Sequence, residues 1–460
     1  MEAVQGYLSA PSSLAAALDL FRTVGLEQLL RWSGDEERYP LAAEAVDRAF
    51  LDPQALLWVY RELGVEGIRR LSGRVEVQTR LFRGIQRIQP DDLLAVFGRT
   101  EDLFALLCAC LSAGETATVE PVTRCFLSLN PALLSSPSVL SLLSSGLSCP
   151  NDTYKVRFCD LIVRLSIASP TLYQTYSAQL DHILALYQTT DLLLKLALVE
   201  IITAFGDSPQ TLNHLLHSPS FPLIAQELDS AYTEDYVKGR VLVLYARAAE
   251  VATDLTLLTG KFWQVLNSFV AVSNLGQFNA AITALCLITR KPEGIAAVLT
   301  RETTLQALFS LVNSPVPEKR LGLYSVLIQA FSSGLEDQSK SLYLRLPVPA
   351  SGRSAVCKEL KSPLFDFHEP CFRLLHSLSR FNWALSAIFG EPELAEILLT
   401  RSPRHNSAIS TLKFEVIEAA HKTPMPFTQL LRARIGEYVA AGVFAPAMGL
   451  VEEAISEPSN

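Results

Sequence analysis

The sequence lacks the short motifs on which most enzyme classes depend. It has no G-x-G-x-x-G loop, and Gly260-Lys261 lacks the earlier glycine and the Ser or Thr of a Walker sequence. It also has no G-x-S-x-G elbow, no H-E-x-x-H helix and no paired C-x-x-C motifs. We therefore expect a protein that is not an enzyme and that takes no cofactor.

Histidine is scarce, with seven residues in the chain. His214 and His217 are spaced by one helical turn, but no acidic or cysteine partner follows them, so a pair at a helix end is expected. His368, Cys371 and His376 could share one helix face. Three ligands on a single helix make an awkward coordination geometry, so we expect core or interface positions and no metal site.

The sequence has no secretory signal peptide, prenylation box or retention signal. Its eight cysteines are scattered through apolar segments and are not spaced as in a secreted disulfide framework. We expect reduced core thiols at Cys108, Cys110, Cys125, Cys159, Cys286 and Cys371. These features predict a soluble protein of the cytoplasm, with the nucleus as a second compartment.

Charge is absent from the stretch Phe262–Thr289, which is long enough to cross a bilayer. Polar residues interrupt it, and Asn274-Leu275-Gly276-Gln277 reads as a turn between two shorter buried helices. The formal net charge of −8 and the lack of a basic tail also disfavour nucleic acid as the main partner. We expect neither a membrane nor a nucleic-acid partner.

The chain has 460 residues, 49% of them hydrophobic, which is too long for one ordinary core and too apolar for disorder. A phrase that contains an apolar helical run recurs about every 40 residues, the period of armadillo and HEAT repeats. Clear copies begin at Tyr154, Leu194, Val237, Phe278 and Glu318. Weaker copies begin at Gln78, Thr118, His368 and Leu412.

A second apolar helix stands between copies, opened by a turn such as Lys291-Pro292-Glu293-Gly294. Apolar residues recur with a period near 3.6, as in Val156, Cys159, Ile162 and Leu165, so the unit is helix, turn, helix. The predicted fold class is all-α, an armadillo/HEAT-like α-solenoid of stacked repeats. The predicted organisation is a helical cap at 1–75, repeats at 76–333, an irregular inter-repeat loop at 334–366, C-terminal repeats at 367–451 and a polar tail at 452–460.

Basic residues recur at the start of the repeated helix, and stacking of repeats would bring them into register as a ladder. Cations at a helix N-terminus oppose the macrodipole, so each needs a compensating charge in the chain or in a partner. One interpretation is an edge that binds an acidic surface of a partner protein. The other, which we favour, is a structural ladder in which each cation bonds the turn of a neighbouring repeat. The ladder residues are Lys155, Arg157, Lys195, Lys238, Arg240, Lys319 and Arg320.

Several phrases of the C-terminal third resemble the family of 26S proteasome non-ATPase regulatory subunit 5. They come in that family's order. Middle-repeat residues around Val156-Arg157, Leu161-Ile162 and Ser169-Pro170 also resemble the family, so the resemblance spans Asn151–Glu453. The phrases are Cys371–Ser379 leading to Trp383 and Ala384–Gly390, then Leu394–Ser402, Lys413–Ile417, Leu431–Arg434 and Gly442–Phe444. The resemblance implies a monomeric chaperone of proteasome base assembly that holds a AAA ATPase subunit by its C-terminal domain.

Two other functions are compatible with the same residues. A generic armadillo/HEAT scaffold or transport adaptor would use the same fold, although the recurring Trp and Asn positions of importin-type adaptors are missing. An enzyme with a helical core would need convergent polar groups, and the sequence shows none.

Overall fold

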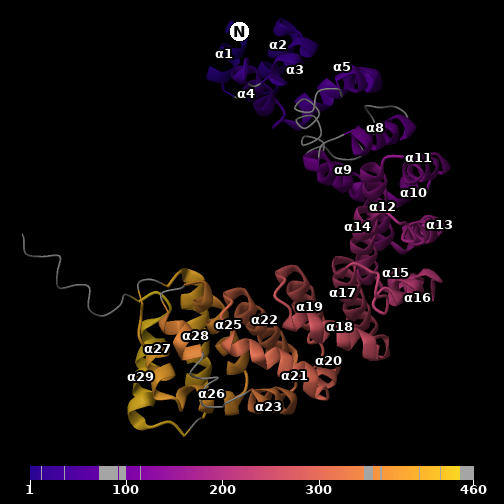
Figure 1. The fold of residues 1–460 in the computed structure, drawn as a ribbon. Coiled ribbons are helices and arrows are strands. Elements are labelled where there is room, and N and C mark those ends of the chain that lie inside the picture. The colour runs from indigo at the N-terminus through magenta and orange to yellow at the C-terminus, as the bar shows by residue number, and fades with distance from the viewer. Residues whose placement is uncertain are drawn as a thin grey trace, which may run out of the picture. The chain divides into compact units, whose positions relative to one another are not determined.

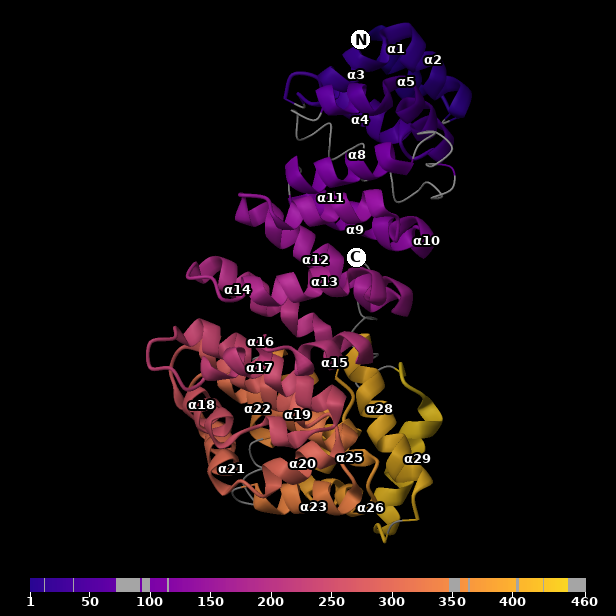
Figure 2. The ribbon, with the colours of Figure 1, turned by 90° about the vertical axis from the view of Figure 1, so that its right-hand side faces the viewer.

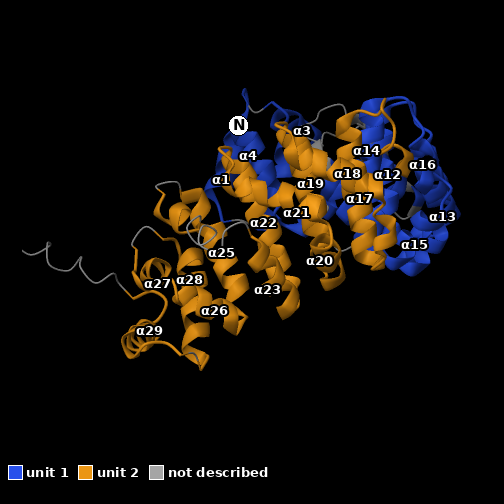
Figure 3. Ribbon diagram, turned by 60° about the horizontal axis from the view of Figure 1, so that its bottom comes forward, with its two compact units in different colours: residues 1–223 blue, residues 224–460 orange. Residues whose placement is uncertain are grey.

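The structure is a computed structural model that describes residues 1–11, 13–35, 37–71, 92, 100–113, 116–346, 356–362, 365–402, 405–424 and 426–445. Its regular secondary structure is helical, and these residues contain no strand (Figure 1). The chain divides into two compact units, residues 1–223 and 224–460 (Figure 3). The division falls inside the predicted repeat region 76–333.

Unit 1 begins with short helices and continues with paired ones. The helices are α1 (Glu2–Ser9), α2 (Leu14–Val24), α3 (Leu26–Ser33), α4 (Pro40–Ala49), α5 (Pro53–Leu71), α8 (Thr100–Ala113), α9 (Thr116–Ser128), α10 (Pro131–Leu134), α11 (Pro137–Leu147), α12 (Asp152–Ala168), α13 (Pro170–Leu186), α14 (Leu192–Thr203), the 3-10 helix η1 (Ala204–Asp207), α15 (Pro209–His217) and α16 (Ser220–Gln226), in which the division falls.

Unit 2 continues the helical pattern. Its helices are α17 (Asp235–Ala252), η2 (Leu255–Leu257), α18 (Gly260–Ala271), α19 (Leu275–Ile288), α20 (Pro292–Leu299), α21 (Glu302–Phe309), η3 (Ser310–Asn313), α22 (Pro317–Ser333), α23 (Glu336–Arg345), η4 (Phe365–Phe367), α25 (His368–Ser379), α26 (Asn382–Phe389), α27 (Pro392–Leu399), α28 (Ser407–Lys422) and α29 (Gln429–Ala441).

Local sequence chemistry explains where many helices begin. The side chains of Asn151, Asp191 and Asn406 accept hydrogen bonds from the first free backbone N–H groups of α12, α14 and α28. Proline opens other helices, including α13, α15, α20, α22 and α27, where its missing N–H costs nothing. Proline at a helix start is the signal that the sequence analysis expected.

In unit 1, α12 is the central helix. It contacts α8, α9, α11, α13, α14 and α15 (Figure 2), and seven of its 17 residues are buried. Phe158, Ile162 and Leu165 are each at most 2% exposed. Burial of this kind contributes about 2–3 kcal/mol for each large apolar side chain, and the neighbouring helices supply it.

In unit 2, one layer is a regular stack in which α17 packs on α19, α19 on α22, α22 on α25, and α25 on α28. The helices between them form a second layer, where α18 packs on α21, α20 on α23, and α27 on both α26 and α29. Each helix therefore contacts its counterpart in the next repeat. This arrangement is the predicted α-solenoid.

Hydrogen bonds between repeats have the period that the sequence showed. The Tyr176 hydroxyl donates to the Leu134 carbonyl, 42 residues away, at 2.6 Å. Gln277 Nε2 donates to Asp235 Oδ2, also 42 residues away, at 2.7 Å. Other hydrogen bonds between repeats have separations from 35 to 48 residues. Similar positions of adjacent repeats therefore face each other, as in a stack of repeats of about 40 residues.

The prediction of an irregular loop over 334–366 is wrong for its first part. Helix α23 forms there, because Leu335 N–H bonds the Gln338 side chain and Glu336 and Asp337 favour the positive end of the helix. The proline and glycine residues that suggested a loop fall later, at positions 347–355 and 363, outside the described residues. The repeat copy Gln78–Phe82 and the tail 452–460 also lie outside them.

The uncharged stretch Phe262–Thr289 forms two helices, α18 and α19, with Asn274 as the N-cap of the second. The boundary predicted at this turn is confirmed. Among the described residues, no single helix has both the length and the apolar character needed to cross a membrane. One pair bent by 92°, Pro292–Leu299 with Glu302–Asn313, meets those two criteria jointly.

The cysteines in the described part of the chain have free thiols. Cys108, Cys125, Cys159 and Cys371 are buried, and burial raises the pKa of each to about 12. Thiols with such pKa values remain protonated and behave as small apolar groups. They are the reduced core residues that the sequence predicted.

Helix α20 approaches the end of α19 so closely that only glycine fits at Gly294. A Cβ there would lie 1.8 Å from the Ile288 carbonyl oxygen. We predict that Gly294→Ala lowers the free energy of unfolding by at least about 2 kcal/mol, because backbone atoms must move apart. The matched control is Gly6→Ala in α1, where no atom lies within 4 Å. In urea unfolding, Gly6→Ala should leave the free energy of unfolding unchanged or raise it by about 0.5–1 kcal/mol. Equal effects of the two substitutions would contradict the prediction.

Candidate protein-binding surface

Four of the ladder residues occupy one position in four helices. Lys155 in α12, Lys195 in α14, Lys238 in α17 and Arg320 in α22 each come three residues after the first residue of the helix. Arg157, Arg240 and Lys319 lie within two residues of that position. The structure thus places the cations at equivalent sites of the repeated helix, within unit 1 for Lys155, Arg157 and Lys195 and within unit 2 for the rest.

The unit 1 cations have partners inside the chain. Lys155 Nζ pairs with Asp152 Oδ1 in the first turn of α12 at 2.7 Å. Arg157 Nη1 donates to the Leu111 carbonyl near the end of α8 at 2.9 Å. The Lys195 ammonium lies 5.3 Å from the centre of the Tyr187 ring, within cation–π distance.

Lys319 and Arg320 in unit 2 join α22 to neighbouring elements. Lys319 Nζ donates to the Val272 carbonyl just after α18 at 2.6 Å. Arg320 donates to the Ser314 carbonyl at 2.6 Å and pairs with Glu359 at 2.7 Å. Both side chains of that ion pair are largely buried.

These contacts show which groups compensate the charge of the cations near the helix N-termini. Arg157 and Lys319 start from a helix N-terminus, yet their charges end on carbonyls at the C-terminal ends of α8 and α18. Helix C-termini carry unpaired carbonyls and partial negative charge, so the cations satisfy both at once. For these residues the chain itself supplies the compensating charge, in a link between repeats.

Other basic residues act in the same way, and the sequence interpretation missed them because they lie outside the repeated phrase. Arg345 donates to the Leu299 carbonyl of α20 at 2.7 Å, and Arg380 donates to the Ser332 carbonyl near the end of α22. Arg401 donates to four carbonyls, those of Tyr438, Gly442, Val443 and Ala445. The available signal was an arginine just after a helix, about 40 residues from another helix end.

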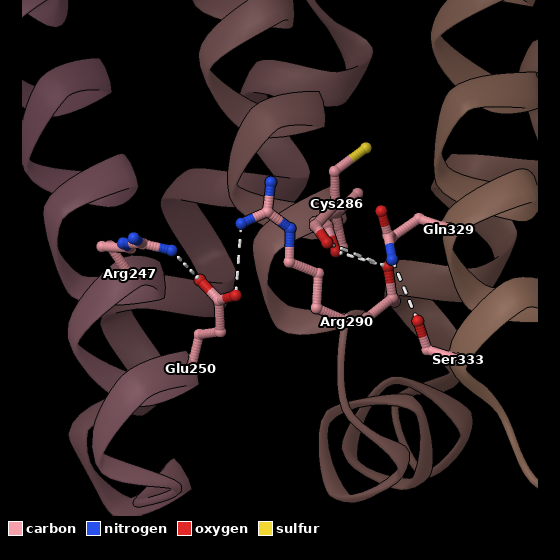
Figure 4. A network of polar contacts seen from close by, with 8 residues as sticks. Arg247, Glu250, Cys286, Arg290, Gln329 and Ser333 are labelled. Carbon is pink, nitrogen blue, oxygen red and sulfur yellow. Dashed lines mark hydrogen bonds and ion pairs between the residues drawn. The ribbon is translucent and has the colours of Figure 1, made fainter. Parts of the chain in front are cut away.

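A carboxylate shared by two arginines joins α17 to the end of α19. Glu250 accepts from Arg247 at 2.8 Å and from Arg290 at 3.2 Å, as Figure 4 shows. Only 10% of the Glu250 side chain is exposed, against 45% for Arg290. The network therefore links two repeats.

Lys413 in α28 is 1% exposed, and its ammonium donates to the Thr400 carbonyl after α27. Burial lowers its pKa to about 8, and the nearby Arg401 guanidinium adds to the shift. Arg401 and Lys413 lie 4.0 and 6.0 Å from the Tyr438 ring of α29. Two cations therefore hold the last helix of the described chain in place.

An exposed apolar patch adjoins the ladder in unit 2, at the start of α17 and α19. Tyr232 is 97% exposed, Tyr236 59% and Leu275 38%. A Cβ at Gly276 would come within 3.6 Å of the Tyr236 ring, so these two helix starts lie side by side. We call Tyr232, Tyr236, Leu275, Lys238 and Arg240 the edge patch.

Aromatic and arginine side chains are enriched at the centres of protein interfaces, which makes the edge patch a candidate binding surface. The sequence interpretation included its two cations and missed its three apolar residues. Exposure of Tyr232 and Tyr236 could not be read from the repeat pattern, because an apolar residue at a helix start is ordinarily buried by the turn before it.

The histidine positions are structural. His214 and His217 lie in the last turn of α15. His214 Nε2 is 3.0 Å from Asp181 Oδ1, and His217 Nδ1 is 2.8 Å from the Asn213 carbonyl. In α25, His368 is buried, and the exposed His376 lies 3.1 Å from Glu415 of α28. The described residues hold no group of three or more His, Cys, Asp or Glu side chains arranged to bind a metal ion.

The link made by Lys319 can be tested by Lys319→Met, which keeps the length of the side chain and removes its charge. We predict a loss of about 1–3 kcal/mol in the free energy of unfolding, because the Val272 carbonyl loses a charged donor. Lys340→Met, at an exposed position of α23, is the control and should change stability by less than about 0.5 kcal/mol in urea titrations. Equal stability of the two variants would exclude a structural role for Lys319.

The low pKa of Lys413 predicts a specific pH dependence. Between pH 10.5 and 8 the unfolded chain binds a proton at this lysine and the folded chain does not, so stability falls as pH falls through that window. Relative to Lys413→Met, the free energy of unfolding of the wild type should therefore rise by up to about 3 kcal/mol from pH 8 to 10.5. Urea unfolding of both proteins at several pH values measures the difference, and a difference constant with pH would contradict it.

Comparison with solved structures finds distant similarity to helical proteins. An engineered protein is 16% identical, with 86% of this chain and 92% of that chain covered and a TM-score of 0.48. A designed armadillo repeat protein in complex with a (KR)4 peptide is 14% identical, with 53% of this chain and 99% of that chain covered and a TM-score of 0.41. UNC-45 from Drosophila melanogaster is 14% identical, with 93% of this chain and 64% of that chain covered and a TM-score of 0.41.

A comparison with curated proteins gives no match. A family model described as "Proteasome non-ATPase 26S subunit" matches residues 49–442. The match confirms the family resemblance seen in the sequence and extends it toward the N-terminus, beyond the start at Asn151 that the short phrases indicated. The chain belongs to the family of proteasome non-ATPase 26S subunits.

Proposed function

We propose that this protein is a non-catalytic chaperone for assembly of the 26S proteasome regulatory particle base. It holds a AAA ATPase subunit by that subunit's C-terminal domain and leaves before the particle is complete. The observation that carries the proposal is the family match over residues 49–442, which takes in nearly all of the described helices. The protein acts as a monomer in the cytoplasm and nucleus.

The edge patch is the proposed contact with the ATPase subunit. Exposed aromatic rings supply contact area at a low entropic cost, and Lys238 and Arg240 beside them fit an acidic partner surface. Of the other ladder residues, Lys319 and Arg320 are already bonded to neighbouring elements within the chain. We therefore assign Lys319 and Arg320 to stability.

Purified protein mixed with a proteasomal ATPase subunit should form a 1:1 complex on size-exclusion chromatography. Capture from lysate should recover ATPase subunits of the base without the proteolytic core. Recovery of importins or vesicle coats in their place would favour the alternative, a general scaffold or transport adaptor built on stacked repeats. Failure to bind any base ATPase subunit would exclude the chaperone role.

The binding surface is tested with Tyr236→Ala combined with Lys238→Glu. Loss of an aromatic contact and reversal of an adjacent charge should weaken the complex at least about tenfold, with an unchanged melting temperature. Leu344→Ala combined with Lys340→Glu, on exposed positions of α23, is the matched control and should bind like the wild type. Full affinity of the edge-patch variant would place the contact elsewhere on the chain.

A further inference from the structure

Tyr232 has the most exposed large apolar side chain of the described residues, at 97%. It lies in a non-helical segment, residues 230–234, that follows the buried Leu228 and leads directly into α17. No described residue forms a hydrogen bond with its hydroxyl group. An unbonded hydroxyl at the end of an almost fully exposed ring is accessible to the active site of a modifying enzyme.

Hydrogen bonds hold the backbone of this segment and leave the ring outside. The Tyr232 N–H donates to Ser230 Oγ at 3.1 Å, and the Thr233 hydroxyl donates to the Glu227 carboxylate. Val237 in the first turn of α17 is 1% exposed, so the segment is also anchored in the core at its C-terminal side. The Tyr232 ring therefore has a defined place on the surface and can enter a cleft of another protein without unfolding of α17.

Acidic side chains stand on both sides of Tyr232 in the sequence. Asp229 precedes it by three residues, and Glu234 and Asp235 follow it by two and three residues, all three at exposed positions. A protein kinase transfers the γ-phosphoryl group of ATP to a hydroxyl that it must first position in its active site. A kinase whose substrate groove is basic complements these carboxylates. The segment thus combines an accessible acceptor with a charge pattern for its recognition.

Two other tyrosines share only part of this combination. Tyr236 is 59% exposed, but it is the second residue of α17, so its backbone cannot extend into a groove while the helix is formed. Tyr39 follows Asp35 and Glu37, but its ring is stacked on that of Trp32 with the ring centroids 5.5 Å apart. Selective modification of Tyr232 is therefore expected.

We propose that Tyr232 is a phosphorylation site for a tyrosine kinase with a basic substrate groove, and that its phosphorylation closes the edge patch to an acidic partner. In the transfer, a bond forms between Tyr232 Oη and the γ-phosphorus of ATP, and the bond from that phosphorus to the β,γ-bridging oxygen breaks. ADP is the leaving group, and the phenolic proton passes to the catalytic carboxylate of the kinase.

The added charge acts directly on the edge patch. A phosphate on tyrosine carries a charge of about −1.5 to −2 at pH 7, which is close in size to the combined positive charge of Lys238 and Arg240. An acidic partner surface then meets an added like charge, and the ring enters the interface only if its phosphate loses water. This effect on binding rests on the proposed function, whereas the acceptor site does not.

The acceptor site is tested on the full chain with ATP, Mg²⁺ and the purified catalytic domain of a tyrosine kinase that prefers acidic substrates. Mass spectrometry should find phosphate on Tyr232 at least about tenfold faster than on Tyr236 or Tyr39, because those two require local opening of the structure. Absence of phosphate from Tyr232, or equal rates at the three tyrosines, would overturn the proposal.

The role of the acidic neighbours is tested by Asp229→Asn combined with Glu234→Gln. Phosphorylation of Tyr232 should slow at least about threefold, because the basic groove loses two complementary charges. The matched control is Glu336→Gln combined with Asp337→Asn, on exposed positions of α23, and it should react like the wild type. Equal rates for the two double variants would contradict recognition through the acidic side chains.

The effect on binding is measured by titrating a proteasomal ATPase subunit into phosphorylated and unmodified protein. Phosphorylation should weaken the complex at least about tenfold with an unchanged melting temperature, and phosphatase treatment should restore it. Tyr232→Phe taken through the same kinase reaction should keep the affinity that it had before the reaction. Equal affinity of the phosphorylated and unmodified wild type would overturn the switch. Failure of the unmodified protein to bind would exclude the chaperone role, and the acceptor site would still be decided by mass spectrometry.

Discussion

The structure depends on one constraint: a pair of short amphipathic helices cannot cover its own apolar face. Each pair must therefore pack against the next, as α19 does between α17 and α22, and the core is shared between neighbours. Hydrogen bonds spaced by about 40 residues follow from the same constraint, because stacking puts equivalent positions opposite each other. The free energy of unfolding then comes mainly from the interfaces between neighbouring repeats and less from one central core.

Basic side chains supply hydrogen-bond donors to the polar ends of the helices in this arrangement. Stacking brings the C-terminus of one helix near the N-terminal part of another, and the exposed carbonyls there need donors. Arg157 and Lys319, near the N-termini of α12 and α22, reach across to supply them. These basic side chains thereby connect neighbouring repeats inside the chain.

The fold could be predicted from the sequence because helix periodicity, proline and asparagine start signals, and the repeated phrase all depend on neighbouring residues. The helix at 336–345 was missed because nearby proline and glycine residues outweighed its own start signals, Glu336 and Gln338. The position of the ladder residues within their helices followed from the repeat. Their bonding partners did not, since the Val272 or Leu111 carbonyl is identified only by three-dimensional packing.

Near α29 one side chain serves several backbone groups at once. The Arg401 guanidinium donates to the carbonyls of Tyr438, Gly442, Val443 and Ala445 and lies against the Tyr438 ring. A planar guanidinium has five N–H donors in a fixed geometry, which a lysine ammonium cannot reproduce. An exchange of this arginine for lysine would therefore not be conservative, although it would keep the charge.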